Sequence, residues 1–167
     1  MNNSLSVLAV LIVHIASCSA FLRAGCNLTI DFKNSCADVQ KEITRRVDGQ
    51  PDSWHDPHNN GNYALLGITR NGSKDKYSLE RKSGTGSKTV YTDSVEFIFE
   101  NSPDENICHV EASSNSQVFS ILDFGTNFCN MNNLYSSDKE CRPFEVLEYT
   151  YTVGKCTDST LKKCYTA

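Results

Sequence analysis

The sequence predicts a disulfide-stabilised α+β domain in which one N-terminal amphipathic helix packs on a curved antiparallel β-sheet. Three observations predict this fold class. One segment repeats apolar residues at spacings of three and four, the chain after residue 62 alternates as strands between turn residues, and 8 cysteines occur among 167 residues. A domain of this size can also bury a core of its own.

An apolar leader begins the chain. Residues 5–16 contain no Lys, Arg, Asp or Glu, and Cys18-Ser19-Ala20 places small residues where signal peptidase inspects the chain. We therefore predict a secretory signal peptide over residues 1–20 and a single secreted, extracellular α+β domain over residues 21–167. Ile15-Ala16-Ser17-Cys18 also resembles a bacterial lipobox, but the dense cysteines favour release through an oxidising compartment.

Residues 27–32 alternate as a short strand, and the amphipathic helix follows it. Ser35 is placed to act as the N-cap, with Asp38 where the helix dipole favours an acidic group, and Asp48-Gly49 ends the helix. The apolar stripe consists of Cys36, Val39, Ile43 and Val47, and the opposite side carries Gln40, Lys41, Glu42, Arg45 and Arg46. One face of the helix is therefore suited to packing on an apolar surface.

The sheet is predicted from alternating segments separated by short turns. The candidate strands are residues 62–70, 74–81, 88–100, 107–113, 117–124 and 145–155, with turns at 71–72, 83–86, 102–104 and 114–116. The short connections indicate a meander in which 62–70 is a central strand. A bulge near Asp93-Ser94, or a change of buried side there, is expected to bend the sheet. No second helix is expected, and residues 125–140 are interpreted as a loop pinned by a disulfide.

The number of cysteines that remain after the leader limits the number of disulfides. Without Cys18 the domain retains Cys26, Cys36, Cys108, Cys129, Cys141, Cys156 and Cys164. This odd number predicts three disulfides and one remaining thiol, and it allows a disulfide-linked dimer. Zinc-type spacings are absent, and we take Cys108 with Cys129 and Cys156 with Cys164 as the working pairs.

Charge and short motifs limit the partners. The formal net charge of −4 argues against a nucleic-acid partner, and no segment after the leader is apolar enough to span a bilayer. The partner is therefore expected to be a small molecule or an extracellular protein. Asn27-Leu28-Thr29 and Asn71-Gly72-Ser73 are N-glycosylation sequons, which predict a glycoprotein if the host is eukaryotic.

The loop after the helix contains a candidate metal site. His55, Asp56 and His58 have the side chains to bind a divalent metal, which leaves a metal-dependent hydrolase as an alternative, although a simple turn explains the same residues. No G-x-S-x-G elbow and no protease-like cysteine context occurs. We therefore assign no catalytic residue and no cofactor, and we expect a protein without catalytic activity.

Ligand capture is the preferred function. The candidate lining residues, between sheet and helix, are Trp54, Tyr63, Phe97, Phe99, Tyr149 and Tyr151, although aromatic residues in strands more often fill a core. The order strand, helix and meander resembles the cystatin fold, and small lipocalin-like barrels are a second analogy. A cystatin likeness would imply a protease inhibitor, but Arg70-Asn71-Gly72-Ser73 stands where cystatins have Q-x-V-x-G. A secreted protein-interaction module or protease inhibitor stays an alternative.

Overall fold

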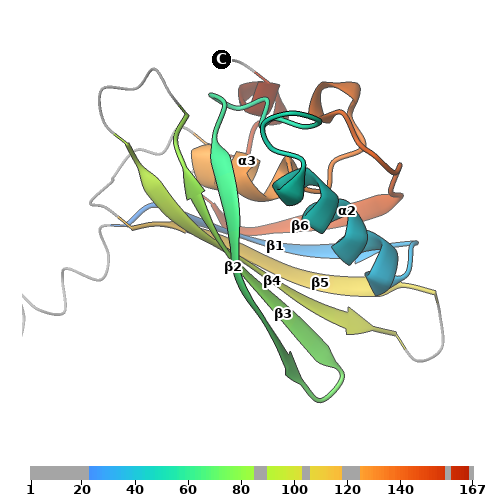
Figure 1. Cartoon of the computed structure of the whole chain (residues 1–167). Coiled ribbons are helices and arrows are strands. Elements are labelled where there is room, and N and C mark those ends of the chain that lie inside the picture. Colours follow the sequence, from blue (N-terminus) through green and yellow to red (C-terminus); the bar gives the residue numbers. More distant parts are fainter. Residues whose placement is uncertain (1–22, 85–89, 103–105, 118–124, 157–158, 166–167) are drawn as a thin grey trace, which may run out of the picture.

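The computed structural model describes residues 23–84, 90–102, 106–117, 125–156 and 159–165, and it shows an antiparallel six-stranded sheet with two α-helices on one face (Figure 1). The elements are β1 (Gly25–Phe32), α2 (Cys36–Asp48), β2 (Asn62–Asn71), β3 (Lys74–Lys82), β4 (Thr92–Asn101), β5 (Cys108–Ser116), α3 (Thr126–Asn132), η2 (Lys139–Cys141), β6 (Tyr149–Cys156) and η3 (Leu161–Tyr165). No helix in these residues is long and apolar enough to cross a membrane.

The strand order is β2-β3-β4-β5-β1-β6. Strands β2 to β5 form the expected meander, and β1 lies between β5 and β6, so that Thr29 pairs with both Glu111 and Thr152. In the described residues β2 and β6 do not pair, which leaves the sheet with two edges. An α+β fold is therefore confirmed, whereas the cystatin-like and lipocalin-like analogies are not.

Helix α2 has the limits and cap that the sequence predicts, since the Ser35 hydroxyl accepts a hydrogen bond from the Asp38 amide. The description of the helix as N-terminal is wrong, because β1 precedes it. The face that was assigned as polar is also partly buried. Glu42 and Arg46 form a buried ion pair, and Glu42 accepts hydrogen bonds from the Phe144 and Glu145 amides. The helix thus lies between the sheet and a later segment of the chain.

Two predictions about the strands are wrong. Strand β2 is an edge strand, and its outer half leaves Leu66 66% and Ile68 52% exposed. The β4 pairing shows no bulge near Asp93, and the buried side does not change there. Asp93 lies on the same buried face as Val95 and accepts a hydrogen bond from Asn130. Because Asp93 is a buried carboxylate, it interrupts the apolar alternation in the sequence although the strand itself is regular.

The segment after β5 also differs from the prediction. Residues 114–116 belong to β5 rather than to a turn, and residues 118–124 of the proposed 117–124 strand lie outside the described residues. Helix α3 occupies part of the expected 125–140 loop, and its Asn127, Asn130 and Asn132 are buried. Strands β4 and β6 begin a few residues later than expected.

The described residues contain three disulfides and one remaining thiol, as the odd cysteine number predicts. The bonds join Cys26 to Cys156, Cys36 to Cys108 and Cys129 to Cys164. Both working pairs were therefore wrong. Two of the observed bonds link the beginning of the domain to distant strands, and cysteine spacing alone cannot choose among the possible pairings.

Candidate functional site

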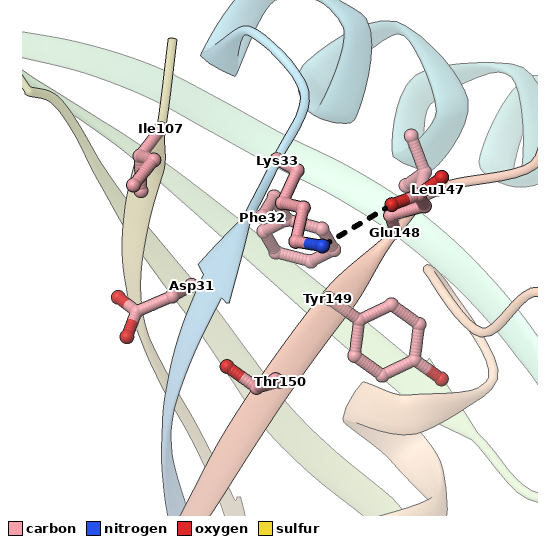
Figure 2. A pocket seen from close by; sticks show the side chains of 8 residues that line it. All are labelled: Asp31, Phe32, Lys33, Ile107, Leu147, Glu148, Tyr149 and Thr150. Atoms are coloured by element: carbon pink, nitrogen blue, oxygen red, sulfur yellow. Dashed lines mark ion pairs between the residues drawn. The ribbon is translucent and has the colours of Figure 1, made fainter. Parts of the chain in front are cut away.

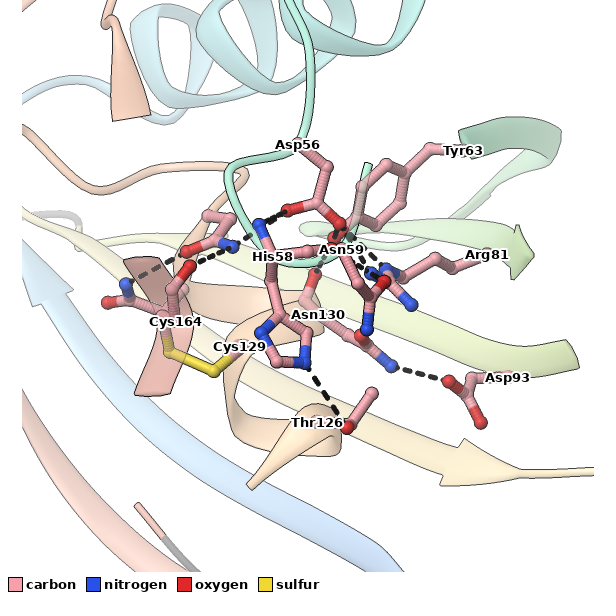
Figure 3. A network of polar contacts seen from close by, with 12 residues as sticks. Asp56, His58, Asn59, Tyr63, Arg81, Asp93, Thr126, Cys129, Asn130 and Cys164 are labelled. Carbon is pink, nitrogen blue, oxygen red and sulfur yellow. Dashed lines mark hydrogen bonds and ion pairs between the residues drawn. A yellow bond between two sulfur atoms is a disulfide. The ribbon is translucent and has the colours of Figure 1, made fainter. Parts of the chain in front are cut away.

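The loop after α2 is organised around the carboxylate of Asp56, which is buried. Its Oδ2 accepts hydrogen bonds from Arg81 Nε at 2.9 Å and Nη2 at 2.6 Å, and its Oδ1 accepts from Asn133 Nδ2 at 2.8 Å and from the His58 amide at 3.0 Å (Figure 3). Both oxygens of the carboxylate thus accept hydrogen bonds, as a buried charge requires. Asp56 is a structural anchor in this arrangement.

The chain turns tightly around Arg81. Its Nη2 also donates to the His58 carbonyl at 2.7 Å and to Asn59 Oδ1 at 2.8 Å. Asn59 and Asn60 both have a φ of 49°, and a Cβ at Gly61 would collide with the guanidinium. Asn tolerates left-handed backbone, so the Asn59-Asn60-Gly61 sequence allows the loop to close on the arginine.

Hydrogen bonds continue from this loop into α3 and the sheet. The Tyr63 hydroxyl donates to the Asn130 carbonyl at 3.1 Å, and the Asn130 side chain donates to Asp93 and to Ser114. Burial, with the Asp56 carboxylate as a second cause, raises the pKa of Tyr63 well above its ordinary value. We call Asp56, Tyr63, Arg81, Asp93 and Asn130 the buried polar cluster.

The structure does not gather the predicted metal ligands. Asp56 faces Arg81, His58 Nε2 lies 3.3 Å from Thr126 Oγ1, and His55 Nδ1 lies 3.5 Å from Arg142 Nη1. No group of three or more His, Cys, Asp or Glu side chains in the described residues is placed to hold a metal ion. The geometry therefore gives the metal-hydrolase alternative no support.

The predicted ligand-lining aromatics lie mostly inside the core. Trp54, Tyr63, Phe97 and Phe99 are buried, with ring centroids 6.1 Å apart both for Trp54 with Tyr63 and for Phe97 with Phe99. Tyr149 and Tyr151 are half-buried and adjoin the core. Tyr149 also lines a surface groove, so it is the residue that connects the prediction to a cavity.

This groove, of about 580 Å³, lies where β1 ends and β6 begins (Figure 2). It is lined by residues 31–33, Ile107 and residues 147–150. Phe32 and Tyr149 stand beside each other with ring centroids 5.5 Å apart. The groove therefore combines aromatic and aliphatic groups with polar ones, which is the usual composition of a small-molecule site.

Charged side chains form the rim. Lys33 Nζ lies 3.5 Å from Glu148 Oε2. The Asp31 carboxylate is hydrogen-bonded to His109 Nδ1 on the neighbouring strand. The side chains of Asp31, Lys33 and Glu148 are half or more exposed, so their charges are available to a polar group on a ligand. The rim can thus select for charge while the apolar groups contact the body of the ligand.

Covalent and hydrogen bonds hold the groove walls in place. The Cys36–Cys108 disulfide stands next to Ile107 on one side and shortly after Lys33 on the other. The Lys33 amide donates to the Glu148 carbonyl at 2.8 Å, and the Ser137 hydroxyl is hydrogen-bonded to both backbone groups of Leu147. Such a groove is largely preformed, which lowers the entropic cost of binding.

Sequence reasoning found Tyr149 but missed the other groove residues. Asp31 and Lys33 follow an ordinary strand alternation, and Ile107 and Glu148 are distant from them along the chain. A predicted Cys36–Cys108 disulfide would have placed Lys33 near Ile107, but the sequence did not indicate that pairing. The two sequon residues, Asn27 and Asn71, are both exposed.

Cys141, the free cysteine of the described residues, is buried, and burial raises the pKa of its thiol to about 11. We expect N-ethylmaleimide to leave this thiol unmodified in the folded protein at neutral pH, and to add one group per chain in denaturant without reductant. Intact-mass spectrometry measures both. Rapid modification of the folded protein would show instead that this region opens, as a disulfide-linked dimer through Cys141 would require.

No protein-family model matches this chain, and no curated protein is similar to it in sequence.

Proposed function

We propose that this chain is an exported binding protein without catalytic activity, and that it captures a small ligand with an apolar or aromatic body in the groove between the ends of β1 and β6. The observation that carries the proposal is the preformed groove of about 580 Å³, with Phe32, Ile107 and Tyr149 in its lining. The location differs from the space between sheet and helix, where the core is filled by buried side chains.

Two further features support this proposal. The charged rim of Lys33 and Glu148 suits a ligand that carries a polar or ionised group beside its apolar body. Three intramolecular disulfides are compatible with passage through an oxidising compartment, as the predicted leader implies.

The test uses 1-anilinonaphthalene-8-sulfonate, an aromatic probe with an anionic group. We expect the folded protein to bind it with a fluorescence increase. Ile107→Trp, which places a larger side chain in the groove, should weaken binding by about tenfold or more, the equivalent of about 1.4 kcal/mol. Val146→Trp is the matched control, because Val146 is 69% exposed and does not line the groove. Equal binding by all three proteins would refute the groove as the site.

A further inference from the structure

The face of the sheet opposite α2 and α3 is not covered by either helix. Both helices contact the other face, and no described element packs on this one. A hollow of about 460 Å³ lies on it, over β4, β5, β1 and β6. Its lining includes Asn27, Thr29, Glu96, Glu111, Ser113 and Gly154. We call this surface the outer face.

Asn27 stands in this hollow. It is exposed on β1 and pairs directly with Ser113 of β5, which in turn pairs with Glu96 of β4. Gly154 of β6 lies on the other side of Asn27. A Cβ added at Gly154 would lie only 3.2 Å from the Asn27 carbonyl oxygen. The absence of a side chain at Gly154 therefore leaves open space beside Asn27.

The Asn27-Leu28-Thr29 sequon is accessible while the chain is being made. Its strand pairs with β5 and β6, which both come much later in the sequence. The adjacent Cys26 bonds to Cys156, 130 residues away. Because neither strand partner nor disulfide partner exists when the sequon emerges, the segment stays extended and reachable, as a glycan-transferring enzyme requires.

We infer that Asn27 carries an N-linked glycan whose first N-acetylglucosamine lies in this hollow and covers the outer face. The inference rests on the export proposed above. The donor is a lipid-pyrophosphate oligosaccharide: Asn27 Nδ2 bonds to the anomeric carbon, the bond from that carbon to the pyrophosphate oxygen breaks, and the lipid pyrophosphate leaves. Nδ2 loses one proton to a base of the transferring enzyme, and nothing is oxidised or reduced.

The chemistry of the hollow suits such a sugar. The carboxylates of Glu96 and Glu111 accept hydrogen bonds from sugar hydroxyls and from the acetamido N–H, and Ser113 provides a hydroxyl. Ile98, between Glu96 and Glu100 on β4, adds an apolar contact for the carbon face of the ring. A neutral polyhydroxylated ligand is favoured because Glu96 already has Lys76 as its ion-pair partner at 2.7 Å.

The test is carbodiimide footprinting of carboxylates on protein secreted from eukaryotic cells, read by peptide mass spectrometry. Glu96 and Glu140 form a matched pair, because their side chains are 41% and 42% exposed and each pairs with a lysine. We expect the wild-type glycoprotein to label Glu96 less than half as fast as Glu140. Asn27→Gln and Thr29→Ala, which both delete the sequon, should make the two rates similar.

Asn71→Gln is the control, since it removes the other sequon, at the tip of the β2–β3 turn, and should leave the Glu96 rate low. Two results overturn the inference: a peptide map in which Asn27 carries no glycan, or a Glu96 to Glu140 ratio that is the same with and without the sequon. Neither result affects the groove, which the fluorescence experiment tests separately on protein of any glycosylation state.

Discussion

Replacing Asp56 by asparagine is expected to lower the free energy of unfolding by about 3–5 kcal/mol, because it leaves the Arg81 guanidinium buried without a negative partner. Asparagine has nearly the same shape, so no cavity forms. Its NH₂ group, however, would face either the two Arg81 donors or the donors from Asn133 and His58. One of these donor sets would lose its acceptor.

Urea unfolding followed by the fluorescence of Trp54 measures this loss, since Trp54 is the one tryptophan and is buried. Glu100→Gln is the control, because its ion pair with Lys74, at 3.0 Å, is partly exposed and should contribute no more than about 1 kcal/mol. Similar, small effects of both substitutions would show that the buried polar cluster does not hold this end of the fold together.

Helix α2 and the β2–β3 hairpin could be predicted because their signals are local. Ser35 caps the helix within its own segment, and Asn71-Gly72 marks a turn in which Gly72 has a φ of 61°. The position of β1 between β5 and β6 could not be predicted, since strand alternation shows which residues face the core but not which strands are neighbours. The disulfide pairs were missed for the same reason.

The buried polar cluster was hidden by residue type. Asp, Asn and Arg usually lie at the surface or in turns, so Asp56 was interpreted as a turn residue or metal ligand and Asn130 as part of a loop. Arg81 carried no signal either, because it lies near the end of a strand that alternates normally. The five members of the cluster lie in the loop after α2 and in β2, β3, β4 and α3, and only the tertiary fold brings them together.

Alanine at both Cys26 and Cys156 is expected to lower the free energy of unfolding by about 2–5 kcal/mol. This disulfide joins the first strand to the last across a sequence separation of 130, so it removes much conformational freedom from the unfolded chain. The bond also stands where the β1–β6 register shifts, between Cys26 and Leu28, and it holds this irregular pairing in place.

The matched comparison is alanine at both Cys129 and Cys164, whose separation is 35. Chain entropy alone makes the longer bond worth about 1 kcal/mol more, so the Cys26–Cys156 variant should unfold at the lower urea concentration. The opposite order would mean that the contacts between α3 and η3, which the shorter bond supports, outweigh the entropy of the unfolded chain. In that case the C-terminal segment, rather than the joining of the terminal strands, limits the stability of the domain.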